Sequence, residues 1–99
     1  MNDPRTLFDL TGRTALITGG SRGLGLQLAE ALGDFGARLL IASRKAADLE
    51  SARAHLSARG IDVSTFVCDN AVDEQAFALA DAAIARLGRV DILVNNAGA

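Results

Sequence analysis

A glycine-rich segment at residues 18–25 is the part of this sequence best suited to chemistry. It reads Thr18, Gly19, Gly20, Ser21, Arg22, Gly23, Leu24 and Gly25, between an apolar run and a helical pattern. Gly19 permits a tight turn directly after a strand, while Gly23 and Gly25 let a pyrophosphate and the sheet approach the start of a helix. Because a first helical turn has unpaired N–H donors and a positive dipole end, the segment predicts a phosphate-binding site.

The spacing of these glycines narrows the kind of loop. It is G-x-x-x-G-x-G, which differs from the G-x-G-x-x-G fingerprint of many dinucleotide-binding proteins. No Gly-Lys-Ser/Thr follows, so a Walker loop is excluded. The alternative is a glycine-rich turn without a ligand, but the position between a strand and an amphipathic helix favours ligand binding.

The end of the second apolar run carries Ser43 and Arg44. Folds that bind NAD usually place Asp or Glu here, about 20 residues after the glycines, to bind the ribose hydroxyls. A carboxylate would repel a 2′-phosphate, whereas Arg44 can bind it in bidentate fashion and Ser43 can donate a hydrogen bond. Arg22 lies where it can close on the same phosphate. The sequence therefore predicts NADP(H) in preference to NAD(H); the alternative is that Arg44 and Lys45 are solvated loop charges.

Polar residues also follow the third apolar run. Asp69 and Asn70 can reach the edge of an adenine ring. They can equally form an Asx turn that leads into the next helix. The residues leave both interpretations open, and one residue can do both.

The fourth apolar run ends in Asn95, Asn96, Ala97 and Gly98. In a sheet ordered 3-2-1-4, the first and fourth strands flank the topological switch point, so the loops after them border one crevice. The small residues Ala97 and Gly98 let a ribose approach the backbone there. Asn95 is expected to tie the strand end to its neighbours.

Few residues are suited to metal binding or nucleophilic attack. His55 has no second His or Cys at ligand spacing, so we expect it to face solvent or a helix flank and expect no metal site. Cys68 ends an apolar run and is expected to be a small core residue. No carboxylate pair and no Ser-His-Asp set is arranged for hydrolysis, and no catalytic residue is assigned.

Apolar runs of strand length alternate with helical patterns. Strands are expected at 14–18, 38–43, 63–67 and 90–94, and helices from about 23, at 46–59 and from about 73. The order βαβαβαβ is typical of right-handed crossovers in a parallel sheet. The apolar residues at helical spacing are Leu24, Leu28, Ala31, Leu32 and Phe35 in the first helix, and Phe77, Ala80, Ile84 and Leu87 in the third.

Length and composition exclude several classes of protein. The 99 residues suit one domain at most, and a net charge of −2 gives no electrostatic basis for nucleic-acid binding. The apolar runs are too short to span a bilayer, and the first residues lack a secretory signal. A single cysteine excludes an internal disulfide. We therefore expect a soluble cytoplasmic protein that binds neither nucleic acid nor membranes.

Together these residues resemble the short-chain dehydrogenase/reductase family. Segment 18–25 matches its T-G-x-x-x-G-x-G cofactor motif, segment 95–98 its N-N-A-G motif, and Asp69 its adenine-contacting acid. The resemblance extends from about Leu7 onward and is closest in wording to bacterial 3-oxoacyl carrier-protein reductases and gluconate 5-dehydrogenases. It implies an α/β fold, a Rossmann-type doubly wound parallel sheet that is incomplete here, within a single NAD(P)-binding domain over residues 1–99.

The resemblance also implies the cofactor contacts. The 2′-phosphate would lie against Arg44, adenine against Asp69 and Asn70, and the nicotinamide ribose against segment 96–98. The other phosphates would be lined by Gly19, Ser21, Arg22 and Leu24. The full set of expected cofactor-binding residues is Gly19, Gly20, Ser21, Arg22, Gly23, Leu24, Gly25, Ser43, Arg44, Asp69, Asn70, Asn96, Ala97 and Gly98.

The family's catalytic Ser, its Tyr-x-x-x-Lys pair and the Asn of its proton relay all come after N-N-A-G, and this chain contains no tyrosine. Hydride transfer also needs a protein group that exchanges a proton with the substrate oxygen. We therefore expect the N-terminal cofactor-binding part of an NADP(H)-dependent oxidoreductase that interconverts a carbonyl and an alcohol of a small molecule, in a homo-oligomeric parent. The main alternative is a non-catalytic stand-alone nucleotide-binding module or sensor; a methyltransferase of the same fold is less favoured.

Overall fold

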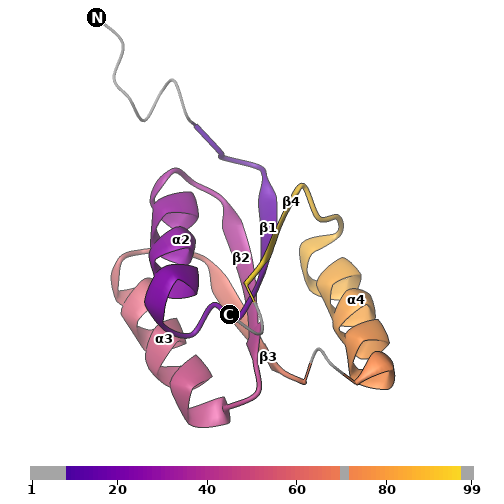
Figure 1. The fold of residues 1–99 in the computed structure, drawn as a ribbon. Helices are drawn as coiled ribbons and strands as arrows, with labels where there is room; N and C mark the ends of the chain where they lie inside the picture. Colours follow the sequence, from indigo (N-terminus) through magenta and orange to yellow (C-terminus); the bar gives the residue numbers. More distant parts are fainter. Residues whose placement is uncertain (1–8, 70–71, 97–99) are drawn as a thin grey trace, which may run out of the picture.

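Strands and helices alternate along the whole described part of the chain (Figure 1). The structure is a computed structural model that describes residues 9–69 and 72–96. In chain order its elements are β1 (Thr14–Thr18), α2 (Gly23–Asp34), β2 (Arg38–Ser43), α3 (Ala46–Ala58), β3 (Val63–Val67), α4 (Asp73–Leu87) and β4 (Ile92–Asn95). The predicted order βαβαβαβ is confirmed, with β4 beginning later than the sequence suggested.

The four strands form one parallel sheet in the order β3-β2-β1-β4, as predicted. Thr18, at the end of β1, is in register with Ala42 of β2 and with Asn95 of β4. The loop after β1 therefore lies between the carboxyl ends of its two neighbouring strands, at the point where the strand order reverses. That position is where open α/β sheets bind ligands.

Helices cover both faces of the sheet. α2 and α3 lie on one face and α4 on the other (Figure 1). Ala15, Ile17, Leu39 and Ile41 belong to the core under α2 and α3, and Leu16, Leu40 and Ala42 to the core under α4. Because β1 and β2 are covered on both sides, their sequences are nearly continuous apolar runs without the alternation of a half-exposed strand. No helix within residues 9–69 and 72–96 combines the length and the apolar character needed to cross a membrane.

The apolar stripe predicted for α2 is correct only in part: Leu32 packs against the core as predicted, but the buried face is turned by about one residue. Leu24 is 62% exposed, whereas Gly25 and Ala29 are buried and Leu26 packs against the core. Gly25 must face the sheet for the helix to approach the loop after β1. Because successive residues differ by roughly 100° around a helix, this contact turns Leu24 outward.

The stripe predicted for α4 is also largely wrong. Leu79, Ala83 and Leu87 face the sheet, whereas Phe77 is 73% exposed and Ile84 is 56% exposed. α4 has apolar residues around more than one face, so periodicity alone allows two orientations. The face that packs contains Leu79, Ala83 and Leu87 at i, i+4 and i+8, with a small residue in the middle that lets the helix lie close to the sheet.

Candidate functional site

The carboxyl ends of β2, β1 and β4 hold the glycine-rich loop from both sides. The Gly19 N–H donates to the carbonyl of Ala42 at 2.8 Å, and the Asn96 N–H donates to the carbonyl of Thr18 at 3.2 Å. The predicted phosphate segment, Ser43 and Asn96 are therefore brought together at one edge of the sheet. Asn70, Ala97 and Gly98 lie outside the described residues.

Gly25 is the position where a side chain is least tolerable. A Cβ there would lie 2.1 Å from the Gly19 carbonyl oxygen and 2.9 Å from Nδ2 of Asn96. The first turn of α2 thus rests directly on the backbone of the loop. Gly23 has a φ of +58° with nothing near a hypothetical Cβ, so its requirement for glycine comes from the backbone angle.

The first turn of α2 has no anion of its own. Its N-cap, Arg22, is extended and makes no capping hydrogen bond, and the first turn contains no acidic residue. By contrast, α3 begins with Asp48 in its first turn and α4 with two acidic residues. Within the described chain, the N–H groups of residues 23–25 have no acceptor. The helix start can therefore accept an external anion such as a phosphate.

The end of β2 lies against the same loop. The Ser21 hydroxyl donates to Oγ of Ser43 at 3.2 Å, and the backbone N–H of Lys45 donates to the same oxygen at 3.3 Å. Arg22 and Arg44 are exposed and form no ion pair with any described residue. Two unpaired guanidinium groups and a serine hydroxyl can serve an anion at this corner.

Asn95 ties β4 to β1, as expected. The Thr18 hydroxyl donates to Oδ1 of Asn95 at 3.0 Å and accepts the N–H of Asn96 at 3.1 Å. The Asn96 side-chain amide donates to the Gly19 carbonyl at 3.4 Å. Asn96 thus supports the glycine loop from the β4 side, and its predicted contact with a ribose stays a prediction.

Asp69 lies at the start of the connection from β3 to α4. Its N–H donates to Oε1 of Gln75 at 2.6 Å, and its carbonyl accepts the N–H of Val72 at 3.0 Å. Gln75 was missed from the sequence. Its side chain reaches back six residues to the N–H of Asp69, farther than the three residues of a capping box, so no local spacing rule identifies this contact.

Comparison with known proteins decides the family. Residues 13–99 match the family model described as short chain dehydrogenase. The chain belongs to the short-chain dehydrogenase family. The match covers both the glycine-rich segment and the N-N-A-G segment from which the resemblance was inferred.

Relatives of this short-chain dehydrogenase chain are enzymes with much longer sequences. It is 46% identical over 93 residues to gluconate 5-dehydrogenase of Gluconobacter oxydans (strain 621H), covering 93% of this chain and 36% of that protein. It is 44% identical over 91 residues to the rhamnolipids biosynthesis 3-oxoacyl-[acyl-carrier-protein] reductase of Pseudomonas aeruginosa, covering 92% of this chain and 35% of that protein. The chain therefore spans about a third of the length of these relatives.

Solved structures agree with the fold. L-sorbose reductase from Gluconobacter frateurii, complexed with NADPH and L-sorbose, superposes with a TM-score of 0.88 at 34% identity; the match covers 93% of this chain and 35% of that one. The RhlG/NADP active-site complex from Pseudomonas aeruginosa gives a TM-score of 0.86 at 43% identity, with 93% and 36% coverage. Both likenesses place this short-chain dehydrogenase chain in the Rossmann-type fold that the sequence predicted.

Two further reactive side chains of this short-chain dehydrogenase chain, Cys68 and His55, contact other parts of the fold. Cys68 is buried in the core under α4, as expected. Burial is the main reason that the pKa of its thiol is raised, and the negative charge of the nearby Asp69 raises it further. His55 is exposed on α3 and contacts the Glu30 carboxylate of α2. Among the residues that the structure describes, no group of three His, Cys, Asp or Glu side chains could hold a metal ion.

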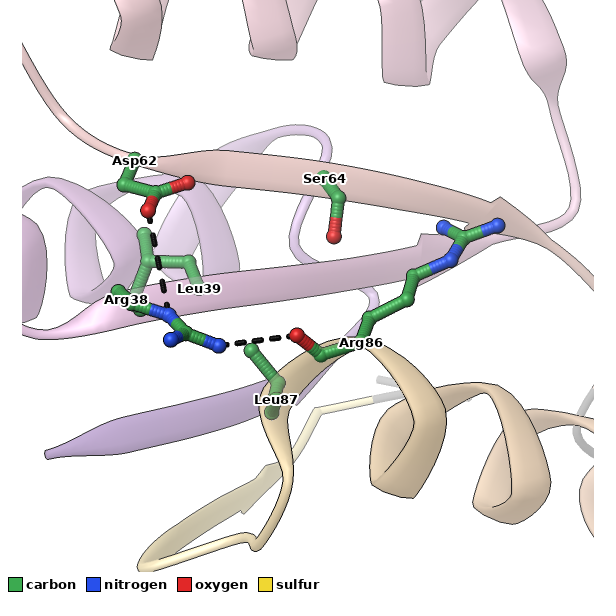
Figure 2. A pocket seen from close by; sticks show the side chains of 6 residues that line it. All are labelled: Arg38, Leu39, Asp62, Ser64, Arg86 and Leu87. Carbon is green, nitrogen blue, oxygen red and sulfur yellow. Dashed lines mark hydrogen bonds and ion pairs between the residues drawn. The ribbon is translucent and has the colours of Figure 1, made fainter.

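A pocket of about 350 Å³ lies away from the glycine loop, at the amino ends of β2 and β3. Figure 2 shows its lining, which consists of Arg38, Leu39, Asp62, Ser64, Arg86 and Leu87. Nη2 of Arg38 donates to the Arg86 carbonyl at 2.9 Å, and Nε of Arg38 lies 3.9 Å from Asp62. Nη1 of Arg86 donates to the Thr65 carbonyl on β3. These contacts join the last turn of α4 to the sheet. We therefore interpret the pocket as part of the packing between α4 and the sheet, separate from the candidate site.

Proposed function

We propose that this chain is the NADP(H)-binding segment of an oxidoreductase that interconverts a carbonyl and an alcohol of a small molecule. The observation that carries the proposal is the corner between β1, α2 and β2. There a helix start without its own anion adjoins a strand end that has Ser43 and Arg44 where NAD-binding folds usually have an acid.

We assign each part of the cofactor to different residues of the candidate site. N–H groups at the start of α2 would bind the pyrophosphate, because the first turn has no capping side chain and no acidic residue of its own. Arg44, Ser43 and Arg22 would bind the 2′-phosphate. Asp69 and Asn70 would contact adenine, and the nicotinamide ribose would lie against Asn96, Ala97 and Gly98.

The relatives support this choice of cofactor and reaction. L-sorbose reductase and RhlG are described in complexes with NADPH and NADP, respectively. The curated relatives are a gluconate 5-dehydrogenase and a 3-oxoacyl-[acyl-carrier-protein] reductase, both of which act on a carbonyl–alcohol pair. A small-molecule carbonyl or alcohol is therefore the substrate class that we propose.

The bound nicotinamide would supply or accept the hydride, and a protein group must exchange the proton. The resemblance to the family implies that a Tyr exchanges this proton, and this chain contains no tyrosine. We therefore place the acid–base group in the part of the relatives' length that this chain does not span, and assign to residues 1–99 the binding and orientation of the cofactor.

The affinities of the chain for NADPH and NADH test the proposal, measured by titration calorimetry. We expect tighter NADPH binding, and expect Arg44→Asp to weaken NADPH binding roughly 10- to 100-fold, as typical of a lost hydrogen bond to a charged group. NADH binding should change much less.

Arg13→Asp is the matched control. Arg13 is exposed just before β1, at the far end of the strand from the candidate site, so the same charge reversal should leave the NADPH affinity nearly unchanged. Tighter binding of NADH than of NADPH by the unaltered chain would contradict the proposal.

A further inference from the structure

One edge of β3 is unpaired in the sheet. β3 lies at one end of the strand order and pairs only with β2. The Leu39 N–H donates to the Asp62 carbonyl at 2.9 Å, and the Cys68 N–H donates to the Ser43 carbonyl at 2.9 Å. Since every second residue of a strand bonds to a given neighbour, the even-numbered residues of β3 bond to β2. The backbone N–H and C=O groups of the other three point to the free edge: Val63, Thr65 and Val67.

The composition of β3 suits this edge to strand pairing. The segment Val63–Val67 reads VSTFV, with no charged residue, glycine or proline. Beta-branched and aromatic residues favour strands, and an exposed edge of this composition is a template for a further strand. Val67 is 54% exposed. Nothing in the side chains of β3 itself therefore opposes the addition of another extended strand.

A charged side chain from α4 covers the middle of this edge. Nη1 of Arg86 donates to the Thr65 carbonyl, and the guanidinium group lies 5.7 Å from the centroid of the Phe66 ring. Figure 2 shows this side chain reaching from the end of α4 to β3. Among the described residues, the other outward-pointing backbone groups of β3 have no hydrogen-bond partner. Arg86 therefore occupies the central acceptor of an otherwise open edge.

The centre of β3 is also where a second copy of the strand would bond. Two identical strands related by a twofold axis pair in antiparallel fashion. With the axis at Thr65, its N–H and C=O groups would exchange hydrogen bonds with those of the second Thr65. Val63 would then lie opposite Val67, and no charged residues would face each other across the pair. The edge is thus complementary to itself, except for the arginine on the Thr65 carbonyl.

We propose that the free edge of β3 is an interface for the β3 strand of a second copy of this chain, and that Arg86 is the strap that keeps it closed. The arginine occupies the Thr65 carbonyl. In addition, two guanidinium groups would meet near the twofold axis, where like charges repel. The proposal does not depend on cofactor binding, because β2 separates β3 from the strand that carries the glycine-rich loop.

Sedimentation equilibrium of an Arg86→Met variant tests the proposal. The variant and its reference both carry Leu93→Gln, which reduces association through the exposed end of β4. Methionine keeps an aliphatic side chain beside Phe66 and removes the guanidinium group. We expect the dissociation constant of the dimer to fall roughly 10- to 100-fold, as typical of a hydrogen bond that involves a charged group. Arg13→Met removes the same charge at an exposed position before β1; this matched control should leave the constant unchanged.

Amide hydrogen exchange followed by NMR shows which surface pairs. In the reference, the Thr65 N–H should exchange rapidly, whereas the Phe66 N–H, which bonds to β2, should be protected. In the Arg86→Met dimer, the exchange of the Thr65 N–H should slow at least roughly tenfold, because it gains a partner in the second copy.

Two results would overturn the proposal. One is an Arg86→Met variant that dimerises no more tightly than Arg13→Met, and the other is a tighter dimer in which the Thr65 N–H still exchanges rapidly. Circular dichroism reports whether Arg86→Met is folded. If it is not, Arg86→Ala replaces it, since alanine has the highest helix propensity, and the same results support or overturn the proposal.

Discussion

Charged side chains of this chain fall into two groups that differ in their partners. Arg53 is paired with Glu50, Arg59 with Asp34, and Arg89 with Asp91. Arg22 and Arg44, at the candidate site, have no such partner among the described residues. Exposed ion pairs contribute little to stability, so the difference matters mainly for binding. A guanidinium group without a carboxylate can bind a phosphate without first breaking an ion pair.

Asp91, in contrast, is a carboxylate that already has hydrogen-bond and ion-pair partners within the fold. Its Oδ2 accepts the backbone N–H of Thr14 at 2.9 Å, and its side chain pairs with Arg89 at 3.1 Å. The hydrogen bond from Thr14 is the main reason that the pKa of Asp91 is lowered from its ordinary value, with Arg89 adding to the effect. This contact joins the beginning of β1 to the residue just before β4.

The lowered pKa predicts how stability depends on pH. A carboxyl group with a lowered folded-state pKa stabilises the fold above its ordinary pKa, and this contribution is lost as the pH falls through the lowered value. Asp91→Asn should therefore be less stable than the unaltered chain at neutral pH, with a difference that shrinks in acid. Urea unfolding at a series of pH values measures this, and a difference that is independent of pH would contradict it.

At the level of single residues, the sequence predicted the parts of the site that depend on local pattern. The glycines, Ser43 with Arg44, and Asn95 could be recognised because a strand end followed by a turn is encoded within a few positions. The contacts of Ser21 with Ser43 and of Gln75 with Asp69 could not, because they depend on how separate segments pack. The assignment of these residues to a cofactor remains a prediction.

At the level of elements, the order and type of every strand and helix followed from apolar periodicity. The inward faces of α2 and α4 followed only in part, through Leu32 and Leu87. Periodicity gives the angular spacing of apolar residues around a helix. It does not say which face of the helix points toward the sheet. In α2 the direction is fixed by Gly25, which rests on the Gly19 carbonyl. In α4 it is fixed by Ala83, which is small and buried between Leu79 and Leu87. Small residues at close contacts therefore predict a buried face better than large apolar ones do here.

The orientation of α4 can be tested by comparing two truncations. Leu79→Ala removes a buried side chain and should lower the free energy of unfolding by about 2–5 kcal/mol. Phe77→Ala removes a larger side chain that is 73% exposed, and should change it by less than about 0.5 kcal/mol. Urea unfolding of the 99-residue chain measures both values, and a Phe77→Ala variant that is as destabilised as Leu79→Ala would contradict this orientation.

At the scale of the whole molecule, the β4 end of the sheet exposes apolar surface. β4 is an end strand that pairs with β1, and Leu93 on it is 64% exposed. Leu93 is in register with Leu16, which belongs to the core under α4, so Leu93 lies on the α4 side of the sheet. Exposed Phe77 and Ile84 of α4 add to the apolar surface of the chain. Exposed apolar residues and an unpaired strand edge are the features through which proteins associate.

We therefore expect the 99-residue chain by itself to self-associate and to bind NADPH weakly. Light scattering over a range of concentrations measures the association. Leu93→Gln should reduce it without unfolding the chain, because the side chain lies largely in solvent and contributes little to the core. Val67→Gln, at an exposed position on the opposite end strand β3, is the matched control and should reduce it less. A monomeric chain with a sharp cooperative unfolding transition and submicromolar cofactor binding would instead favour a stand-alone nucleotide-binding module.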